Sequence, residues 1–216
     1  MNPWVLAIVV GGIIVIWFVV KRLYFDPAER EHKIAVRESM DRQAQKRNGQ
    51  VVVKSGQPTL TVTHGRVEID LSLVRYNDEI YREHTFARFK VEYFASKQFL
   101  IALNSKDLLL KPIPLADKLE LSDQQFNEQF VVTGNDQVFI NDLLTKQIRE
   151  KLCEQTFQVS LGRRTDAAIL NREQGWLTVF TQLVRTGDEV FDGLIDTAIL
   201  FHDRLETLNA AATSSK

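Results

Sequence analysis

The chain has 216 residues, of which 44% are hydrophobic and 25% are charged, close to the averages of globular proteins. We therefore expect one packed domain rather than extended disorder. The 27 basic and 28 acidic residues give a formal net charge of −1, so the chain lacks the basic field typical of nucleic-acid-binding proteins. Its single cysteine, Cys153, excludes an internal disulfide and a Cys-cluster metal site.

An apolar run without charge extends from Trp4 to Val20. As a helix it would cover about 25 Å of a bilayer core of roughly 30 Å, so the sequence predicts a single transmembrane anchor at residues 1–25. The alternative is a cleavable signal peptide, but no basic residue precedes the run and no small-residue cleavage site follows it. Ala7 and Gly11 have the spacing at which two membrane helices can pack, so a weak homodimer is a further hypothesis.

The charges beside this run predict an orientation. Lys21, Arg22, Arg30 and Lys33 follow it, and no basic side chain precedes it. The positive-inside rule then predicts a single-pass protein of the cell membrane whose soluble domain is cytoplasmic. Export of the domain is the alternative, because long domains can cross a membrane regardless of flanking charge.

The sequence of residues 26–49 indicates a stalk helix. Asp26 is suited to an N-cap and Pro27 to the first helical position, while Asn48-Gly49 supplies a stop. The apolar positions form only a thin stripe, which argues against a long coiled coil. This stripe consists of Val36, Met40 and Ala44.

The hydrophobic period changes to two beyond Gly49, which predicts strands. Residues 59–63 and 66–74 predict a hairpin around the turn His64-Gly65. Further strands are predicted at 86–95, 97–103 and 107–113. The first half, residues 50–122, is therefore predicted to be an antiparallel, meander-like sheet.

For the second half of the domain, residues 123–209, the sequence predicts secondary-structure elements in the order β-α-β-β-α. A strand at 129–133, a turn at Gly134-Asn135-Asp136 and a helix to about Cys153 precede strands at 156–162, 167–171 and 176–183. The segment 176–183 also fits a helical period. Thr186 and Glu189 predict a capping box for a closing helix, in which Leu194 and Leu205 should be buried against the sheet.

The predicted fold class is thus α+β. It comprises a transmembrane helix and a stalk helix, followed by an antiparallel β-rich domain at 50–209 with a β-α-β-β-α C-terminal portion. Residues 50–122 and 123–209 are candidate subdomains, and residues 210–216 predict a disordered tail.

The segment QFVVTGNDQVFINDLLTKQIREKL, a hairpin and the amphipathic DGLIDTAILFHDRLETL together resemble the C-terminal portion of a family of bacterial membrane-anchored proteins of unknown function. The likeness covers about the C-terminal 80 residues. Its matching positions are Phe130, Val132, Asp136, Leu143 and Leu144. The chain departs from the family in having one predicted anchor where related sequences often have two or more. The resemblance implies a membrane-anchored α+β domain and brings no activity with it.

Motifs for chemistry are absent from the sequence. No glycine-rich phosphate loop occurs, and the turn Gly134–Gln137, which could present N–H groups to an anion, is better explained by Asp136 as a helix cap. The four histidines, His32, His64, His84 and His202, lack the spacing of a metal site.

Other polar residues are also better explained without chemistry. A solvated loop accounts for the titratable cluster of Asp78, Glu79 and His84, and packing accounts for His202. Cys153 is expected to be a small core residue, and the pair Arg163-Arg164 an exposed one. We accordingly predict no catalytic, cofactor-binding or metal-binding residue.

The leading hypothesis is a membrane-anchored, non-enzymatic protein-interaction or scaffold domain that binds through a sheet edge or the closing helix. Its expected partners are the membrane and another protein, and not nucleic acid. One alternative is a hydrolase-like enzyme whose residues converge in the fold, around Asp78, Glu79 and His84 or around Asp136 and His202. The other is a small-ligand or lipid sensor with an apolar pocket.

Overall fold

The computed structural model describes Gly12, Trp17 and residues 26–54, 56–76, 82–94, 96–103, 118–161, 175–181 and 186–214, with 26–30, 74–76 and 82–84 described by their backbone alone. The chain divides into two compact units, Met1–Ser39 and Met40–Lys216. All the strands that the structure describes lie in the second unit, as do the described helices that follow residue 123.

Helix α2 (Asp26–Arg47) confirms the helix predicted at 26–49. Asn48 takes the left-handed conformation, with φ of 51°, which ends the helix as an Asn or Gly does at such a position. The backbone N–H of Gly49 then donates to the carbonyl of Ala44 at 2.8 Å. Met40 and Ala44, from the predicted apolar stripe, are buried.

The transmembrane part of the predicted fold class is contradicted. Of residues 1–25 the structure describes only Gly12 and Trp17, and among the described residues no helix is both long enough and apolar enough to span a bilayer. The two longest described helices, α2 and α6 (Asp188–Ser214), carry charged residues along their length. The fold class is corrected to helices packed on one large antiparallel sheet. The predicted descriptions transmembrane and single-pass are not supported, because they rested on the predicted membrane helix.

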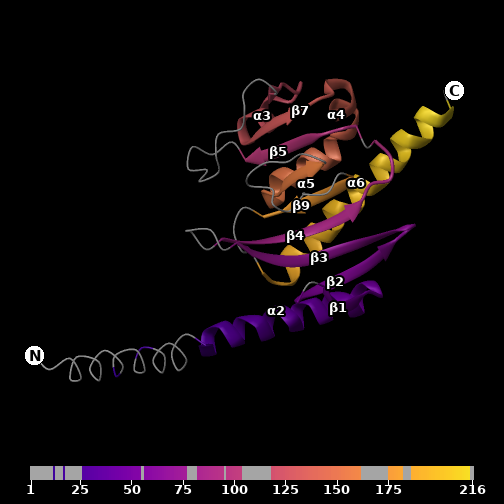
Figure 1. Ribbon diagram of the computed structural model, residues 1–216. Helices are drawn as coiled ribbons and strands as arrows, with labels where there is room; N and C mark the ends of the chain where they lie inside the picture. The colour runs from indigo at the N-terminus through magenta and orange to yellow at the C-terminus, as the bar shows by residue number, and fades with distance from the viewer. Residues whose placement is uncertain are drawn as a thin grey trace, which may run out of the picture. The chain divides into compact units, whose positions relative to one another are not determined.

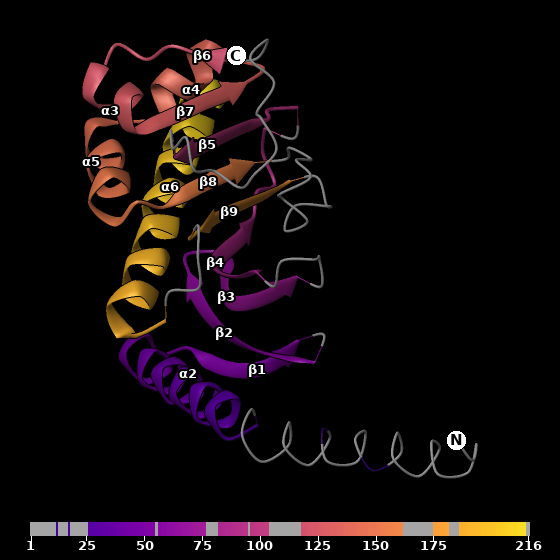
Figure 2. The ribbon, with the colours of Figure 1, turned by 90° about the vertical axis from the view of Figure 1, so that its left-hand side faces the viewer.

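In the described part of the chain, nine strands form this single sheet, whose strands are labelled in Figure 2. In chain order they are β1 (Gln50–Lys54), β2 (Gln57–His64), β3 (Val67–Tyr76), β4 (Arg82–Lys90), β5 (Phe99–Leu103), β6 (Lys118–Leu119), β7 (Phe130–Gly134), β8 (Gln158–Leu161) and β9 (Trp176–Phe180). Their order across the sheet is β1-β2-β3-β4-β9-β8-β5-β7-β6. All eight neighbouring pairs are antiparallel.

The predicted hairpin is confirmed as β2 and β3, which join through the two residues Gly65 and Arg66. Gly65 has φ of 59°, which glycine adopts without strain. The strand predicted at 86–95 instead runs from Arg82 to Lys90, and β9 confirms a strand within 176–183. The predicted strands 107–113 and 167–171 lie outside the described residues.

The first half of the chain does not form a sheet of its own. Strand β9, from the second half, pairs with β4 in the register Phe86 to Phe180 and on to Lys90 to Trp176. Strand β5, from the first half, lies between β8 and β7. The predicted boundary between residues 122 and 123 therefore does not divide the strands into two sheets. Strands from the two halves of the chain are interleaved in one sheet.

The two faces of the sheet differ in polarity. One row of cross-strand neighbours is apolar and buried, and it consists of Leu60, Leu71, Ala87, Val179, Val159, Ile101 and Val132. The row beside it, on the opposite face, is mainly polar and consists of Thr61, Asp70, Arg88, Thr178, Ser160, Leu100 and Thr133. Helices α5 (Lys146–Gln155) and α6 lie on one side of the sheet (Figure 2). The apolar row therefore faces the helix layer.

The single helix predicted from Asp136 to Cys153 is two helices, α4 (Gln137–Leu143) and α5. Leu144 leaves the helical conformation, and the Thr145 hydroxyl accepts from the backbone N–H of Ile148 as the N-cap of α5. A further short helix, α3 (Gln124–Gln129), begins after the N-cap Asp123 and was not predicted. The predicted β-α-β-β-α order is therefore wrong.

Helix α6 packs on β3, β4 and β9 (Figure 1). Leu194 and Leu205 are 0% and 2% exposed, which confirms their predicted burial. The helix begins at Asp188, and the N–H of Phe191 donates to the carbonyl of Gly187. Thr186 therefore lies one position too early for the predicted capping box. At the other end the helix continues to Ser214 through the predicted disordered tail.

Ion pairs tie the last turns of α2 to the first turns of α6. Nη2 of Arg47 lies 2.5 Å from Asp192 and 2.8 Å from Asp196, and Lys46 pairs with Asp192 at 2.8 Å. Burial alone would raise the pKa of Asp192, but hydrogen bonds from Lys46 and Arg47 outweigh burial and lower it.

Candidate functional site

Strand β1 forms one edge of the sheet (Figure 2). It pairs with β2 over five successive residues, from Gln50 opposite Thr61 to Lys54 opposite Gln57. Among the described strands it has no neighbour on its other side. An antiparallel strand uses alternate backbone groups for each neighbour, so β1 has N–H and C=O groups that the sheet does not use. At the opposite edge, the described part of the chain gives β6 two residues, Lys118 and Leu119.

An exposed valine accompanies this open edge. Val53 is 69% exposed and, by the alternation along β1, lies on the same face as Val51, which is opposite the core residue Leu60. Natural sheets often protect an edge with proline, a bulge or charge. In β1 the only charged residue is Lys54, at the end of the strand, and its Nζ is bound to Asp70 at 2.6 Å.

A second polar cluster lies where the β2–β3 turn meets α6. His64 is the last residue of β2, and His202 and Asp203 are neighbours on α6. Nε2 of His64 lies 2.7 Å from Oδ1 of Asp203, and Nδ1 of His202 lies 3.1 Å from the same oxygen. One carboxylate oxygen thus serves two imidazoles from different elements.

The environment of this cluster is graded from buried to open. The His202 side chain is 9% exposed, against 34% for His64 and 57% for Asp203. The His202 ring meets those of His64 and Phe89 edge-on, with centroids 5.4 and 5.6 Å apart. Burial raises the pKa of Asp203, but hydrogen bonds from the two histidines outweigh burial and lower it.

A cavity of about 190 Å³ adjoins His202. Its lining includes Phe89, Tyr93 and Leu205 together with the charged residues Lys90 and Glu206. Ligand-binding pockets are usually about 300 to 1,000 Å³, so this cavity is small for an organic ligand. It gives little support to the small-ligand sensor hypothesis.

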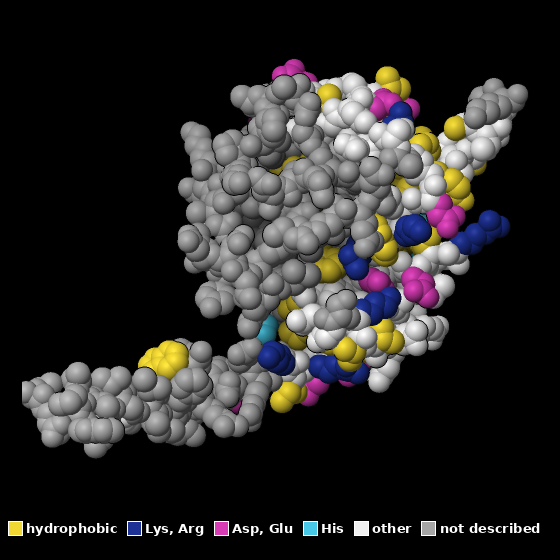
Figure 3. All heavy atoms as spheres, viewed as in Figure 1, with side chains coloured by type: hydrophobic (Ala, Val, Ile, Leu, Met, Phe, Trp, Pro, Cys, Tyr) yellow, Lys and Arg dark blue, Asp and Glu magenta, His cyan; other side chains and the backbone are white. Residues whose placement is uncertain are grey.

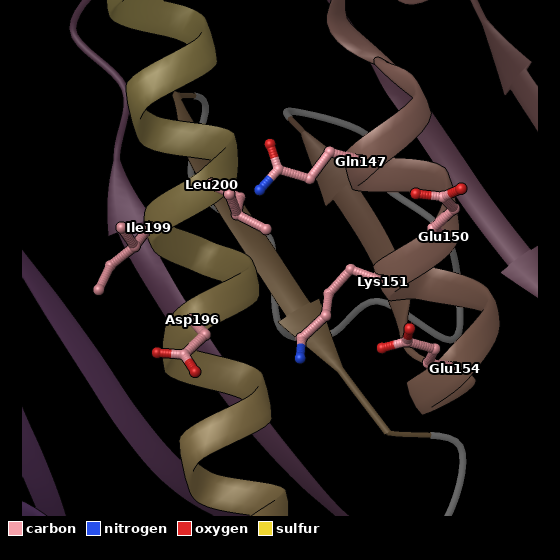
Figure 4. Close-up of a pocket in the computed structure, with 7 residues that line it drawn as sticks. All are labelled: Gln147, Glu150, Lys151, Glu154, Asp196, Ile199 and Leu200. Atoms are coloured by element: carbon pink, nitrogen blue, oxygen red, sulfur yellow. The ribbon is translucent and has the colours of Figure 1, made fainter.

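A larger hollow of about 390 Å³ lies between α5 and α6 (Figure 4). Lys151 and Leu200 project into the space between the two helices, while Glu150 lies on the far side of α5 (Figure 4). The lining residues are Gln147, Glu150, Lys151, Glu154, Asp196, Ile199 and Leu200. Five of these seven are charged or amide side chains, whereas ligand pockets are mostly apolar, so the hollow resembles a solvated groove between helices.

The structure assigns Asp136 a capping role, as predicted. Its side chain accepts from the backbone N–H of Phe139 at 2.9 Å and pairs with Nζ of Lys97. The hydrogen bond from Lys97, followed by that from Phe139, lowers the pKa of Asp136. The contacts of Asp136 and of His202 are with different residues, so these contacts do not bring the two together as the enzyme hypothesis required.

The other predicted candidates contribute no described site. Asp78, Glu79, Arg163 and Arg164 lie outside the described residues, and of His84 only the backbone is described. Cys153 is half-buried on α5, and burial raises the pKa of its thiol. That shift makes Cys153 a weaker nucleophile at neutral pH than a free thiol.

Sequence reasoning missed the convergence of His64 with His202 and Asp203. His64 and Asp203 are 139 positions apart along the chain, so no short-range motif could show their contact. One weak signal was available, because His64 precedes a glycine turn and therefore had to lie at an end of the sheet.

Acidic and basic side chains are interspersed over the described surface visible in Figure 3, which agrees with the balanced composition. No protein-family model, no curated protein and no solved structure matches the chain.

Proposed function

We propose that residues 40–214 form a non-enzymatic protein-interaction domain that binds an extended segment of a partner protein alongside β1. The open edge strand with its exposed Val53 carries this proposal. A partner strand would use the backbone groups of β1 that face away from β2, which is the recognition mode called β-augmentation.

The chemistry of β1 indicates what kind of segment it would accept. Val51 and Val53 lie on the face of the sheet that the helices cover, and Gln50, Val52 and Lys54 lie on the polar face. A partner strand with apolar residues toward the first face and polar residues toward the second would continue both. We therefore expect an amphipathic, alternating segment rather than a helix or a uniformly charged peptide.

The other strands of the sheet also favour the free edge of β1 as the binding surface. Among the described residues, the opposite edge strand β6 comprises Lys118 and Leu119, and the interior strands have neighbours on both sides. Because backbone pairing supplies affinity in this mode, a strand of five residues is the better of the two edges.

Site-directed photocrosslinking tests the proposal in the full chain. A photoreactive amino acid at position 53 should form a specific crosslink with a partner protein in cells. Val138 is the matched control, because it is an equally exposed valine, 70% against 69%, on α4 rather than on an edge.

Introducing a charge at the edge strand is a second test of the proposal. Val53→Lys should abolish recovery of that partner, because a lysine on an edge disfavours strand addition, whereas Val138→Lys should not. Both exposed substitutions should change stability by less than about 0.5 kcal/mol. Equal partner recovery from the two lysine variants, or crosslinking at 138 as strong as at 53, would remove the basis of the proposal.

A further inference from the structure

We propose that His64, His202 and Asp203 form a binding site for one divalent cation of the zinc type. Each residue offers one ligand atom, and these atoms all lie within 4.8 Å of one another. The site is distinct from the β1 edge, so either proposal can fail without the other.

The ligand set selects the class of ion. Two imidazoles and one carboxylate suit zinc and its neighbours among the first-row transition metals. Calcium and magnesium prefer ligand sets made of oxygen atoms. Three protein ligands leave the fourth position of a tetrahedral ion to water.

Two of the three separations between the proposed ligand atoms are close to those that zinc requires. Ligand atoms about 2.0 to 2.2 Å from a tetrahedral ion lie roughly 3.3 Å from each other. Here Asp203 Oδ1 is 2.7 Å from His64 Nε2 and 3.1 Å from His202 Nδ1. An ion would take the place of the protons that now bridge these atoms, and small rotations of the exposed side chains would open the required space.

The surroundings hold the site in place while leaving it accessible. His202 is 9% exposed and its ring is packed against Phe89, so its orientation is largely fixed before an ion arrives. His64 and Asp203 are 34% and 57% exposed, which gives the ion a path from solvent.

Glu206 is a carboxylate close to the site. Its Oε1 lies 3.9 Å from Nε2 of His202, the nitrogen that would not bind the ion, which is longer than a hydrogen bond, and a small rotation of the exposed Glu206 side chain would bring the two atoms into contact. Zinc-binding histidines commonly direct their other nitrogen at a carboxylate, which orients the ring and raises its basicity. Helix α6 thus carries two of the three proposed ligands, His202 and Asp203, and also carries Glu206 one turn after His202.

Cobalt titration tests the site in the full-length protein. After treatment with a chelator, Co²⁺ should bind with one equivalent and give the visible absorption of a tetrahedral cobalt ion. Zn²⁺ should displace the cobalt and abolish that absorption. The absence of a saturable one-equivalent signal would overturn the proposal.

Matched variants separate this site from other ligands in the chain. Asp203→Asn keeps a hydrogen-bond acceptor but removes the anionic ligand, and His64→Gln removes an imidazole; each should weaken cobalt binding at least about tenfold. Glu206→Gln should weaken it less than either of these two variants, because Glu206 is not a ligand and lies 3.9 Å from His202 Nε2. His32→Gln and Cys153→Ser should bind as the wild type does. Undiminished binding by both Asp203→Asn and His64→Gln would show that the ion binds elsewhere.

A measurement on the wild type guards against variants that fail to fold. Zn²⁺ should protect His64 from modification by diethyl pyrocarbonate, as mapped by mass spectrometry, whereas His32 should react equally with and without the ion. Equal modification of His64 in both conditions would mean that the three side chains form only a hydrogen-bonded link between the β2–β3 turn and α6.

Discussion

Truncation of Leu194 to alanine should strongly destabilise the domain. Leu194 lies on the face of α6 that packs against the sheet and is 0% exposed. Replacing a fully buried leucine with alanine costs about 2 to 5 kcal/mol, because apolar contact is lost and a cavity remains. This is a large part of the roughly 5 to 15 kcal/mol that stabilises a typical domain.

Urea denaturation of the full-length protein measures this effect. With a loss of about 3 kcal/mol and a urea dependence of about 2.5 kcal/mol per molar, the unfolding midpoint should fall by roughly 1.2 M. Leu208, half-buried near the end of the same helix, is the matched control, and Leu208→Ala should cost less than about 1 kcal/mol. Equal midpoints for the wild type and Leu194→Ala would refute the view that α6 holds the sheet together and would indicate a loosely docked helix.

Three further predictions concern single groups. Gln158→Met should raise the unfolding midpoint, because both amide atoms of Gln158 are buried without a hydrogen-bond partner among the described residues and such a group costs about 1 to 3 kcal/mol. Gly134→Ala should cost about 1 to 3 kcal/mol in the same assay, since its Cβ would lie 2.9 Å from the carbonyl oxygen of Gln98. Arg47→Met should be destabilising at pH 7 relative to the wild type. That difference should close as the pH falls below about 4, because the lowered pKa of Asp192 stabilises the fold only while its carboxylate is ionised.

Local patterns in the sequence predicted the elements whose structure is decided locally. The alternation of Val67, Ile69 and Leu71 was enough for the β2–β3 hairpin, because a strand with one buried face needs that period. The burial of Leu194 and Leu205 followed from helical spacing in the same way.

Competing local signals explain the helix that proved to be two. The apolar spacing of Ile140, Leu144 and Ile148 fits one continuous helix, and it concealed Thr145 as a new N-cap. A threonine in this position offers the backbone an alternative to helical hydrogen bonding, so the chain can restart a helix without losing its buried face.

The cluster of His64, His202 and Asp203 depends on tertiary structure and could not be predicted from the sequence. His64 and His202 meet because β2 and the last helix are brought together by the order of the sheet. The open edge was equally hidden, since the sequence indicates that a segment is a strand but not which strand lies last. The transmembrane helix was predicted from hydropathy alone, and among the described residues no helix has the required length and apolarity.

The pairing of β4 with β9 has a consequence for the order in which the chain folds. These central strands are about 90 residues apart in sequence, so the seam between them has high contact order and its closure is slow. A ribosome delivers β1 to β4 long before it delivers β9 and α6, which means that the apolar face of the first four strands emerges without its cover. During synthesis β4 is itself a second open edge, and the nascent chain is therefore most exposed to misassociation until β9 and α6 appear.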